Sequence, residues 1–174
     1  MSEERVILVD EGDVEVGTAE KLRAHADGAL HRAFSVVVFN AAGQMLLQCR
    51  AAEKYHSAGL WSNACCGHPR PGEDVRQGAR RRLREEMGID CELEPLFHLR
   101  YRAEFADGLA ENEYDHVFAA RCDQPLRPDP AEVQAWRWVG MDDIRRDLAR
   151  APERYTAWFP LLVDRLAPAG SARD

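Results

Sequence analysis

The segment 67–89 constrains this chain more than any other part of its sequence. A loop rich in glycine and proline leads into an expected helix over residues 74–87, whose apolar residues recur four positions apart on one stripe. Gly88 follows as the expected helix stop. Glu85 and Glu86 lie side by side near that end. A carboxylate pair at a helix end beside such a loop can hold a hard cation such as Mg2+, which in turn binds phosphate oxygens.

Short β-branched and aromatic runs around this helix predict strands. We expect strands at residues 33–39, 44–49, 61–66, 96–105, 113–121 and 135–139, and further helices at 18–26, 142–150 and 153–166. Thr18 is the expected N-cap of the first of these helices. The pattern favours an α/β (α+β) fold in which a mixed β-sheet lies between α-helices.

Length and charge narrow the possible partners. The 174 residues, 45% of them hydrophobic, are enough for a single domain over 1–174, with a flexible tail at about 167–174. A net charge of −7 opposes broad nucleic-acid binding, which needs a basic face. No apolar run approaches the ~20 residues of a membrane span. We therefore expect a small-molecule partner rather than a nucleic acid or a membrane; the oligomeric state is open, and a monomer is compatible with the sequence.

Five cysteines, an odd number, include the adjacent pair Cys65-Cys66. The beginning of the chain is acidic and lacks the features of a signal peptide. We therefore expect reduced thiols in the cytoplasm rather than a disulfide framework.

A second group of residues has the donor types of a metal site. It comprises His25, His31, His68, Glu111 and Glu113. The two glutamates lie two apart, which places both carboxylates on one face if the segment is extended. Three imidazoles with two carboxylates suit Mn2+ or Mg2+, or alternatively Zn2+. Spacing alone does not bring these groups together.

The segment 67–89 resembles the Nudix box. Its positions are filled by Gly67, Glu73, Arg81, Leu83, Glu85, Glu86, Gly88 and Ile89. One position departs, because Arg82 stands where the hydrolases carry a glutamate that contributes to their metal cluster. The resemblance implies a Nudix fold, and the departure speaks against pyrophosphate hydrolysis.

Four further segments resemble the type 1 isopentenyl-diphosphate isomerases, which have the Nudix fold but isomerise. They are His25 with His31, the run Ser62–Pro69 (SNACCGHP), Tyr101–Ala103 and Glu111–Glu113. The resemblance extends from about Val6 to Val163. It implies interconversion of isopentenyl diphosphate and dimethylallyl diphosphate in isoprenoid biosynthesis, by protonation and deprotonation through a tertiary carbocation.

The resemblance also implies roles for individual residues. The first divalent metal would be held by His25, His31, His68, Glu111 and Glu113. Mg2+ carried by the substrate diphosphate would be held by Glu86 and the Cys66 carbonyl. The diphosphate would be bound by Lys21, Arg50, Lys54 and Arg82. Cys66 and Glu113 would be the catalytic acid and base, with Tyr101 as a supporting hydroxyl and Trp158 as an aromatic lid.

Two alternatives compete with this interpretation. A Nudix pyrophosphohydrolase of a nucleoside diphosphate derivative would use Glu85 and Glu86 but gives no role to Cys66. A metal-stabilised binding module would hold a diphosphate without changing it. We interpret Cys65 as a packing residue on the opposite side of the strand from Cys66. The remaining histidines are interpreted as structural or surface residues: His56, His98 and His116.

Overall fold

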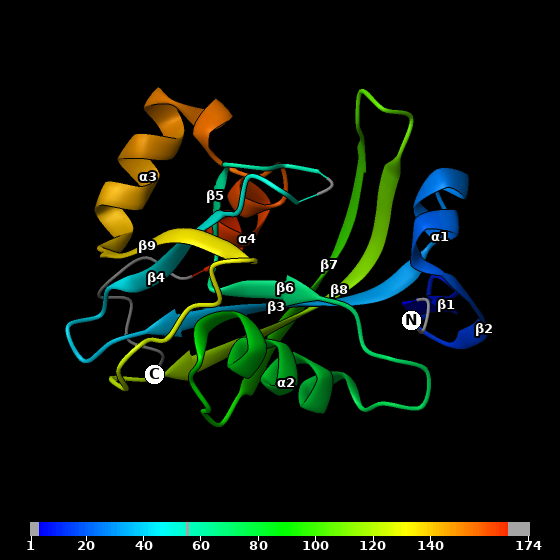
Figure 1. Ribbon diagram of the computed structural model, residues 1–174, viewed down its shortest axis with the longest axis horizontal. Coiled ribbons are helices and arrows are strands. Elements are labelled where there is room, and N and C mark those ends of the chain that lie inside the picture. The colour runs from blue at the N-terminus through cyan, green and yellow to red at the C-terminus, as the bar shows by residue number, and fades with distance from the viewer. Residues whose placement is uncertain (1–3, 55, 167–174) are drawn as a thin grey trace.

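Within residues 4–54 and 56–166, which the computed structural model describes, nine strands form one mixed sheet with helices on both faces (Figure 1). The strands are β1 (Arg5–Val9), β2 (Glu15–Glu20), β3 (His31–Phe39), β4 (Met45–Arg50), β5 (Trp61–Ser62), β6 (Cys65–Gly67), β7 (Glu94–Glu104), β8 (Ala110–Arg121) and β9 (Val133–Val139). The helices are α1 (Lys21–Asp27), α2 (Val75–Met87), α3 (Met141–Arg150), the 3-10 turn η1 (Pro152–Arg154) and α4 (Phe159–Arg165). None of these helices, all from the described residues, is long and apolar enough to cross a membrane. The tail predicted at 167–174 lies outside the described residues.

β3 is the central strand of the sheet. It pairs in parallel with β8 and antiparallel with β1, β4 and β6. Its apolar run is buried on both faces, which is why it is continuous rather than alternating. Val36 and Val38 pack in the core cluster that contains Leu83 of α2, whereas Val37 packs in the cluster that contains Phe159 of α4. The predicted α+β architecture, a mixed sheet between helices, is confirmed.

α2 begins after a cap at Asp74, which was not predicted from the sequence, and ends at the predicted Gly88 stop. The Asp74 side chain caps its first turn by accepting a hydrogen bond from the Gln77 N–H at 3.1 Å. Gly88 ends the helix with a φ of 70°, and its N–H donates to the Arg84 carbonyl. A Cβ at Gly88 would lie 2.5 Å from the Arg127 carbonyl oxygen, so any larger residue would have to displace that backbone. The helix predicted at 74–87 is thus confirmed.

The helix predicted at 18–26 is present as α1, but its predicted start and its predicted N-cap at Thr18 are wrong. Thr18 lies in β2, which pairs with β1, and the helix begins only at Lys21. Strands β1 and β2 were not foreseen. Pairing with another segment outweighs the weak local preference of such a short helix.

The final predicted helix, 153–166, is interrupted. η1 ends at Arg154 and α4 begins at Phe159, with Pro160 in its first turn. A helix continuing through Pro160 would lose a backbone hydrogen bond and force the ring against the preceding turn. The segment between the two helices instead joins β5, where the Thr156 N–H donates to the Trp61 carbonyl at 3.0 Å. The strand predicted at 61–66 is likewise divided into β5 and β6.

Candidate active site

Four potential metal ligands converge where α1, β3, β6 and β8 meet. The ligand atoms of His25, His31, His68 and Glu113 all lie within 4.8 Å of one another, and we call this group the imidazole cluster. The parallel register of β3 and β8 places His31 directly beside Glu113. His68 follows the last residue of β6, which pairs with β3. Sheet pairing therefore assembles residues that are up to 88 positions apart, from 25 to 113.

Backbone carbonyls orient two of the imidazoles. The Nδ1 atom of His25 lies 2.7 Å from the Lys21 carbonyl oxygen, and that of His31 lies 2.8 Å from the Ala29 carbonyl oxygen. An imidazole that donates through Nδ1 keeps the lone pair of Nε2 for a metal. The Asn112 amide also donates to the Gly28 carbonyl at 3.1 Å, which joins β8 to the turn that ends α1. Local structure thus directs both rings into the cluster.

The electrostatics of the imidazole cluster centre on Glu113. Its Oε1 atom lies 3.0 Å from His68 Nε2 and 3.6 Å from His31 Nε2. Burial alone would raise the pKa of Glu113, but the contacts with the two imidazoles bring it well below its ordinary value. Burial lowers the pKa of His68, which favours the neutral form that binds metals.

These donors fit a divalent cation. The buried Nδ1 atom of His68 and the Oε2 atom of Glu111 have no hydrogen-bond partner within the described residues. Buried polar atoms without a partner are costly, and a cation held by imidazole and carboxylate groups would relieve that cost. Glu111, which the sequence placed in the same set, lies outside the four-residue cluster, and its Oε1 atom is 2.6 Å from His56 Nε2.

Cys66 faces the cavity next to this cluster. Its Sγ atom lies 3.4 Å from the Ser35 hydroxyl and accepts a hydrogen bond from the Asn63 amide at 3.3 Å. Burial raises the pKa of the thiol, and the nearby Asp115 carboxylate adds to the effect, so the thiol keeps its proton. The neighbouring Cys65 is fully buried in the core on the α2 side, as predicted.

A buried hydrogen bond continues from Cys66 into the sheet. The Ser35 hydroxyl donates to Asp115 Oδ2 at 2.7 Å. Burial, with repulsion from Glu113, raises the pKa of Asp115 to about 8. The contact fixes the serine whose oxygen lies against the thiol.

Aromatic residues form the apolar wall of the site. Trp158 is buried and donates its indole N–H to Asn63 Oδ1 at 3.2 Å, so one amide contacts both the indole and the Cys66 thiol. The Tyr101 ring lies 6.0 Å from the Trp158 ring, edge to face. Tyr101 also lies opposite Glu113 in the β7–β8 pair, and burial raises the pKa of its hydroxyl.

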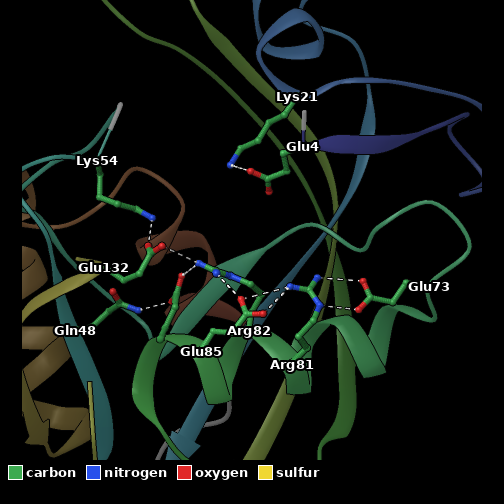
Figure 2. Close-up of polar contacts among 10 residues, drawn as sticks. Glu4, Lys21, Gln48, Lys54, Glu73, Arg81, Arg82, Glu85 and Glu132 are labelled. Atoms are coloured by element: carbon green, nitrogen blue, oxygen red, sulfur yellow. Dashed lines mark hydrogen bonds and ion pairs between the residues drawn. The ribbon is translucent and has the colours of Figure 1, made fainter. Parts of the chain in front are cut away.

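Cations and carboxylates alternate along the other side of the site (Figure 2). Arg82 contacts Glu85 and Glu86 at 2.6 Å each and Glu132 at 3.4 Å, and Lys54 pairs with Glu132. Gln48 donates to the second oxygen of Glu86 at 3.0 Å. Arg81 binds both oxygens of Glu73, at 2.8 and 3.0 Å. We call this group the cation network: Lys54, Arg81, Arg82, Glu73, Glu85, Glu86 and Glu132.

A cavity of about 490 Å³ connects the two groups. Of the residues predicted from the sequence, its lining includes Lys21, Arg50, Lys54, Cys66, His68, Arg82, Glu111, Glu113 and Trp158. His25, His31, Glu86 and Tyr101 are not among the lining residues and are buried. The predicted acid and base, Cys66 and Glu113, therefore open onto one cavity with all four predicted diphosphate-binding cations.

Comparison with known proteins identifies the family. The model of the NUDIX domain matches residues 29–159. An isopentenyl-diphosphate Delta-isomerase 1 of Aromatoleum aromaticum is 52% identical over 164 residues, covering 94% of this chain and 93% of the relative. An isopentenyl-diphosphate Delta-isomerase of Burkholderia multivorans is 52% identical over 163 residues, with the same coverage of 94% and 93%. This chain belongs to the type 1 isopentenyl-diphosphate isomerase family.

Solved structures agree with the Nudix fold of this isomerase family. A Deinococcus radiodurans protein superposes with a TM-score of 0.78 at 21% identity, covering 95% of this chain and 100% of that one. A MutT protein of Methanosarcina mazei gives a TM-score of 0.63 at 22% identity, covering 78% and 91%. At such identities the likeness shows the fold alone.

Sequence reasoning missed part of this isomerase-type site. His56 was interpreted as structural or surface, yet it lines the cavity and contacts Glu111. Glu4 and Glu132, which pair with Lys21 and Lys54, were not singled out. The available signal was weak, because a lone histidine or glutamate in a loop carries no spacing pattern.

Proposed function

We propose that this chain interconverts isopentenyl diphosphate and dimethylallyl diphosphate through a tertiary carbocation. The observation that carries the proposal is the placement of Cys66 and Glu113 on one cavity that is also lined by Lys21, Arg50, Lys54 and Arg82. An alkene needs a proton donor and a proton acceptor, and the diphosphate needs cations. Membership of the isomerase family supports the same reaction.

Cys66 and Glu113 serve as the acid–base pair in this proposal. One group protonates an alkene carbon, and the other removes a proton from the carbon next to the cation, so that their roles exchange with the direction of reaction. The raised pKa of the Cys66 thiol keeps it protonated, as a donor must be. Tyr101 lies opposite Glu113, and its buried hydroxyl has no hydrogen-bond partner within the described residues, so in this proposal it is available to support the reacting groups.

The surrounding residues place the substrate and exclude water. The four cations bind the diphosphate, which does not react and instead anchors the hydrocarbon. Trp158 covers the apolar end, and an indole face attracts a cation by roughly 0.5–2 kcal/mol. Exclusion of water prevents the tertiary cation from being captured as an alcohol.

The proposed reaction includes two metals, of which the first has the converging donors of the imidazole cluster. His25, His31, His68, Glu111 and Glu113 would hold Mn2+, Mg2+ or Zn2+, and Glu86 with the Cys66 carbonyl would hold Mg2+ that arrives with the diphosphate. The bound cations supply positive charge that biases the proton affinity of Glu113 and neutralises the phosphates. All five cysteines are free thiols, which suits action in the cytoplasm.

Proton and phosphorus NMR in D2O tests the proposal. The purified chain with isopentenyl diphosphate, Mg2+ and Mn2+ should yield deuterated dimethylallyl diphosphate without free phosphate. Release of phosphate would instead indicate the hydrolase alternative, which Arg82 opposes because it replaces a metal-binding carboxylate. An unchanged diphosphate that remains bound would indicate the binding module.

A further inference from the structure

His56 occupies an unexpected position in the cavity wall. It lies in the loop between β4 and β5, is 8% exposed, and places its Nε2 atom 2.6 Å from Glu111 Oε1. The contact joins two segments that are distant in the sequence. Both side chains are buried to the same degree, at 5% exposure, so the contact is shielded from water.

The His56 ring is held from three sides. It stacks on Phe105 with ring centroids 4.7 Å apart and an angle of 10° between the rings. The Trp158 ring meets it edge to face at 6.1 Å. The Ser57 hydroxyl lies 3.1 Å from Nδ1. A hydroxyl that donates to Nδ1 leaves Nε2 as the nitrogen that donates to the carboxylate.

Glu111 has one oxygen engaged and one without a partner. His56 contacts Oε1, whereas the buried Oε2 atom accepts no hydrogen bond from the described residues. Glu111 lies two positions before Glu113 on β8, so both carboxylates lie on the same face of that strand. Metal-binding carboxylates commonly accept a supporting hydrogen bond through one oxygen and bind the metal through the other.

We propose that His56 is a positioning residue that holds Glu111 so that its free oxygen can join the metal ligands of the imidazole cluster. The proposal rests on the metal site proposed above. It also means that the aromatic wall and the metal site share a support, because Phe105 and Trp158 both pack against the ring that orients Glu111.

Mn2+ binding to the metal-stripped full-length chain tests the proposal, with free Mn2+ measured by electron paramagnetic resonance. His56→Phe keeps a ring to stack on Phe105 but removes the donor. Loss of such a supporting partner weakens metal affinity by roughly 10–100-fold. His56→Gln can place an amide N–H near the position of Nε2 and should recover much of that loss. His98→Gln, at an exposed histidine of β7, should bind Mn2+ as the unaltered chain does.

A double-mutant cycle with Glu111→Gln separates positioning from general loosening of the fold. If His56 acts through Glu111, the double variant His56→Phe/Glu111→Gln should bind Mn2+ no more weakly than Glu111→Gln alone. Additive losses, or an unchanged affinity in His56→Phe, would overturn the proposal. If His56→Phe does not fold, failure of His56→Gln to bind more tightly than His56→Ala would overturn it as well.

The same titration distinguishes this inference from the proposed function. Failure of the unaltered chain to bind Mn2+ would remove the metal site itself. Normal Mn2+ binding with no dependence on His56 would remove only the positioning role and would leave the isomerase proposal standing.

Discussion

The two sides of the cavity, the imidazole cluster and the cation network, differ in how their buried charged groups are paired. In the imidazole cluster, Glu113 is the single carboxylate beside three histidines and contacts two of them, and the nearby Glu111 keeps one oxygen without a partner within the described residues. In the cation network, Lys54, Arg81 and Arg82 each already contact at least one carboxylate. The imidazole cluster and Glu111 therefore offer donor atoms that a cation could contact. In the cation network, the cations and carboxylates already neutralise one another.

This difference in charge pairing predicts how the imidazole cluster and the cation network respond to a ligand. A cation added to the imidazole cluster fills a gap, so binding should stabilise the fold with little rearrangement. A diphosphate added to the cation network must replace carboxylates that already hold the cations, so affinity depends on exchange of partners. Cys66 lies between the two sides, and substitutions can separate chemistry, metal binding and diphosphate binding.

Cys66→Ala should have the largest effect. Removal of a general acid–base group lowers kcat by roughly 10²–10⁴-fold. Affinities for Mn2+ and for inorganic pyrophosphate should be unchanged, because neither side of the cavity loses a charged group. Steady-state kinetics and titration calorimetry measure the two properties. Cys65→Ala, on the opposite face of β6, should keep its turnover; near-normal turnover in Cys66→Ala would refute the catalytic role.

Metal binding should stabilise the fold through the imidazole cluster. At a concentration 100 times its Kd, Mn2+ should raise the free energy of unfolding by about 2.7 kcal/mol. In His68→Ala most of this gain should disappear at the same concentration, because one of four converging ligands is lost. Denaturant unfolding with and without Mn2+ measures the gain. His98→Ala should retain it, and an equal gain in His68→Ala would show that the metal binds elsewhere.

Arg82→Glu should weaken the binding of inorganic pyrophosphate. A hydrogen bond to a charged group contributes roughly 1.5–3 kcal/mol, so Kd should rise by roughly 10–100-fold. Mn2+ binding at the imidazole cluster should change little. Arg84→Glu on the same helix provides the matched charge reversal, because Arg84 is half exposed and pairs with Asp90 outside the cavity. An unchanged Kd in Arg82→Glu would contradict the role of Arg82 in diphosphate binding.

Glu132→Gln should have the smallest effect and the opposite sign. Glu132 competes with a diphosphate for Lys54 and Arg82, and partly exposed ion pairs contribute about 0.2–1 kcal/mol. We expect pyrophosphate to bind a few-fold more tightly, roughly two- to fivefold by calorimetry. Glu92→Gln, at an exposed partner of Arg80, is the control. Weaker binding in Glu132→Gln would mean that this carboxylate helps to hold Mg2+ instead of competing.

Local signals predicted the elements whose causes lie within a few residues. The helix at 74–87 was recognisable because its apolar stripe and its Gly88 stop act over one or two turns. The central strand was recognisable from its continuous apolar run. The helix expected from Thr18 begins only at Lys21, because β2 pairs with β1 up to Glu20. The last helix is interrupted because the segment before Phe159 joins β5 and Pro160 lies in the first turn of α4.

The sequence by itself determined the Nudix box, the central strand and, through resemblance, the identities of the candidate ligands and catalytic groups. Only the tertiary structure decided three contacts of the site. Glu111 contacts His56, Asn63 contacts both Cys66 and Trp158, and Glu132 pairs with Lys54 and Arg82. The physical reason is the sequence separation over which each interaction acts. Helix periodicity and caps depend on neighbours along the chain, whereas these contacts join side chains that only the pairing of distant strands brings within reach.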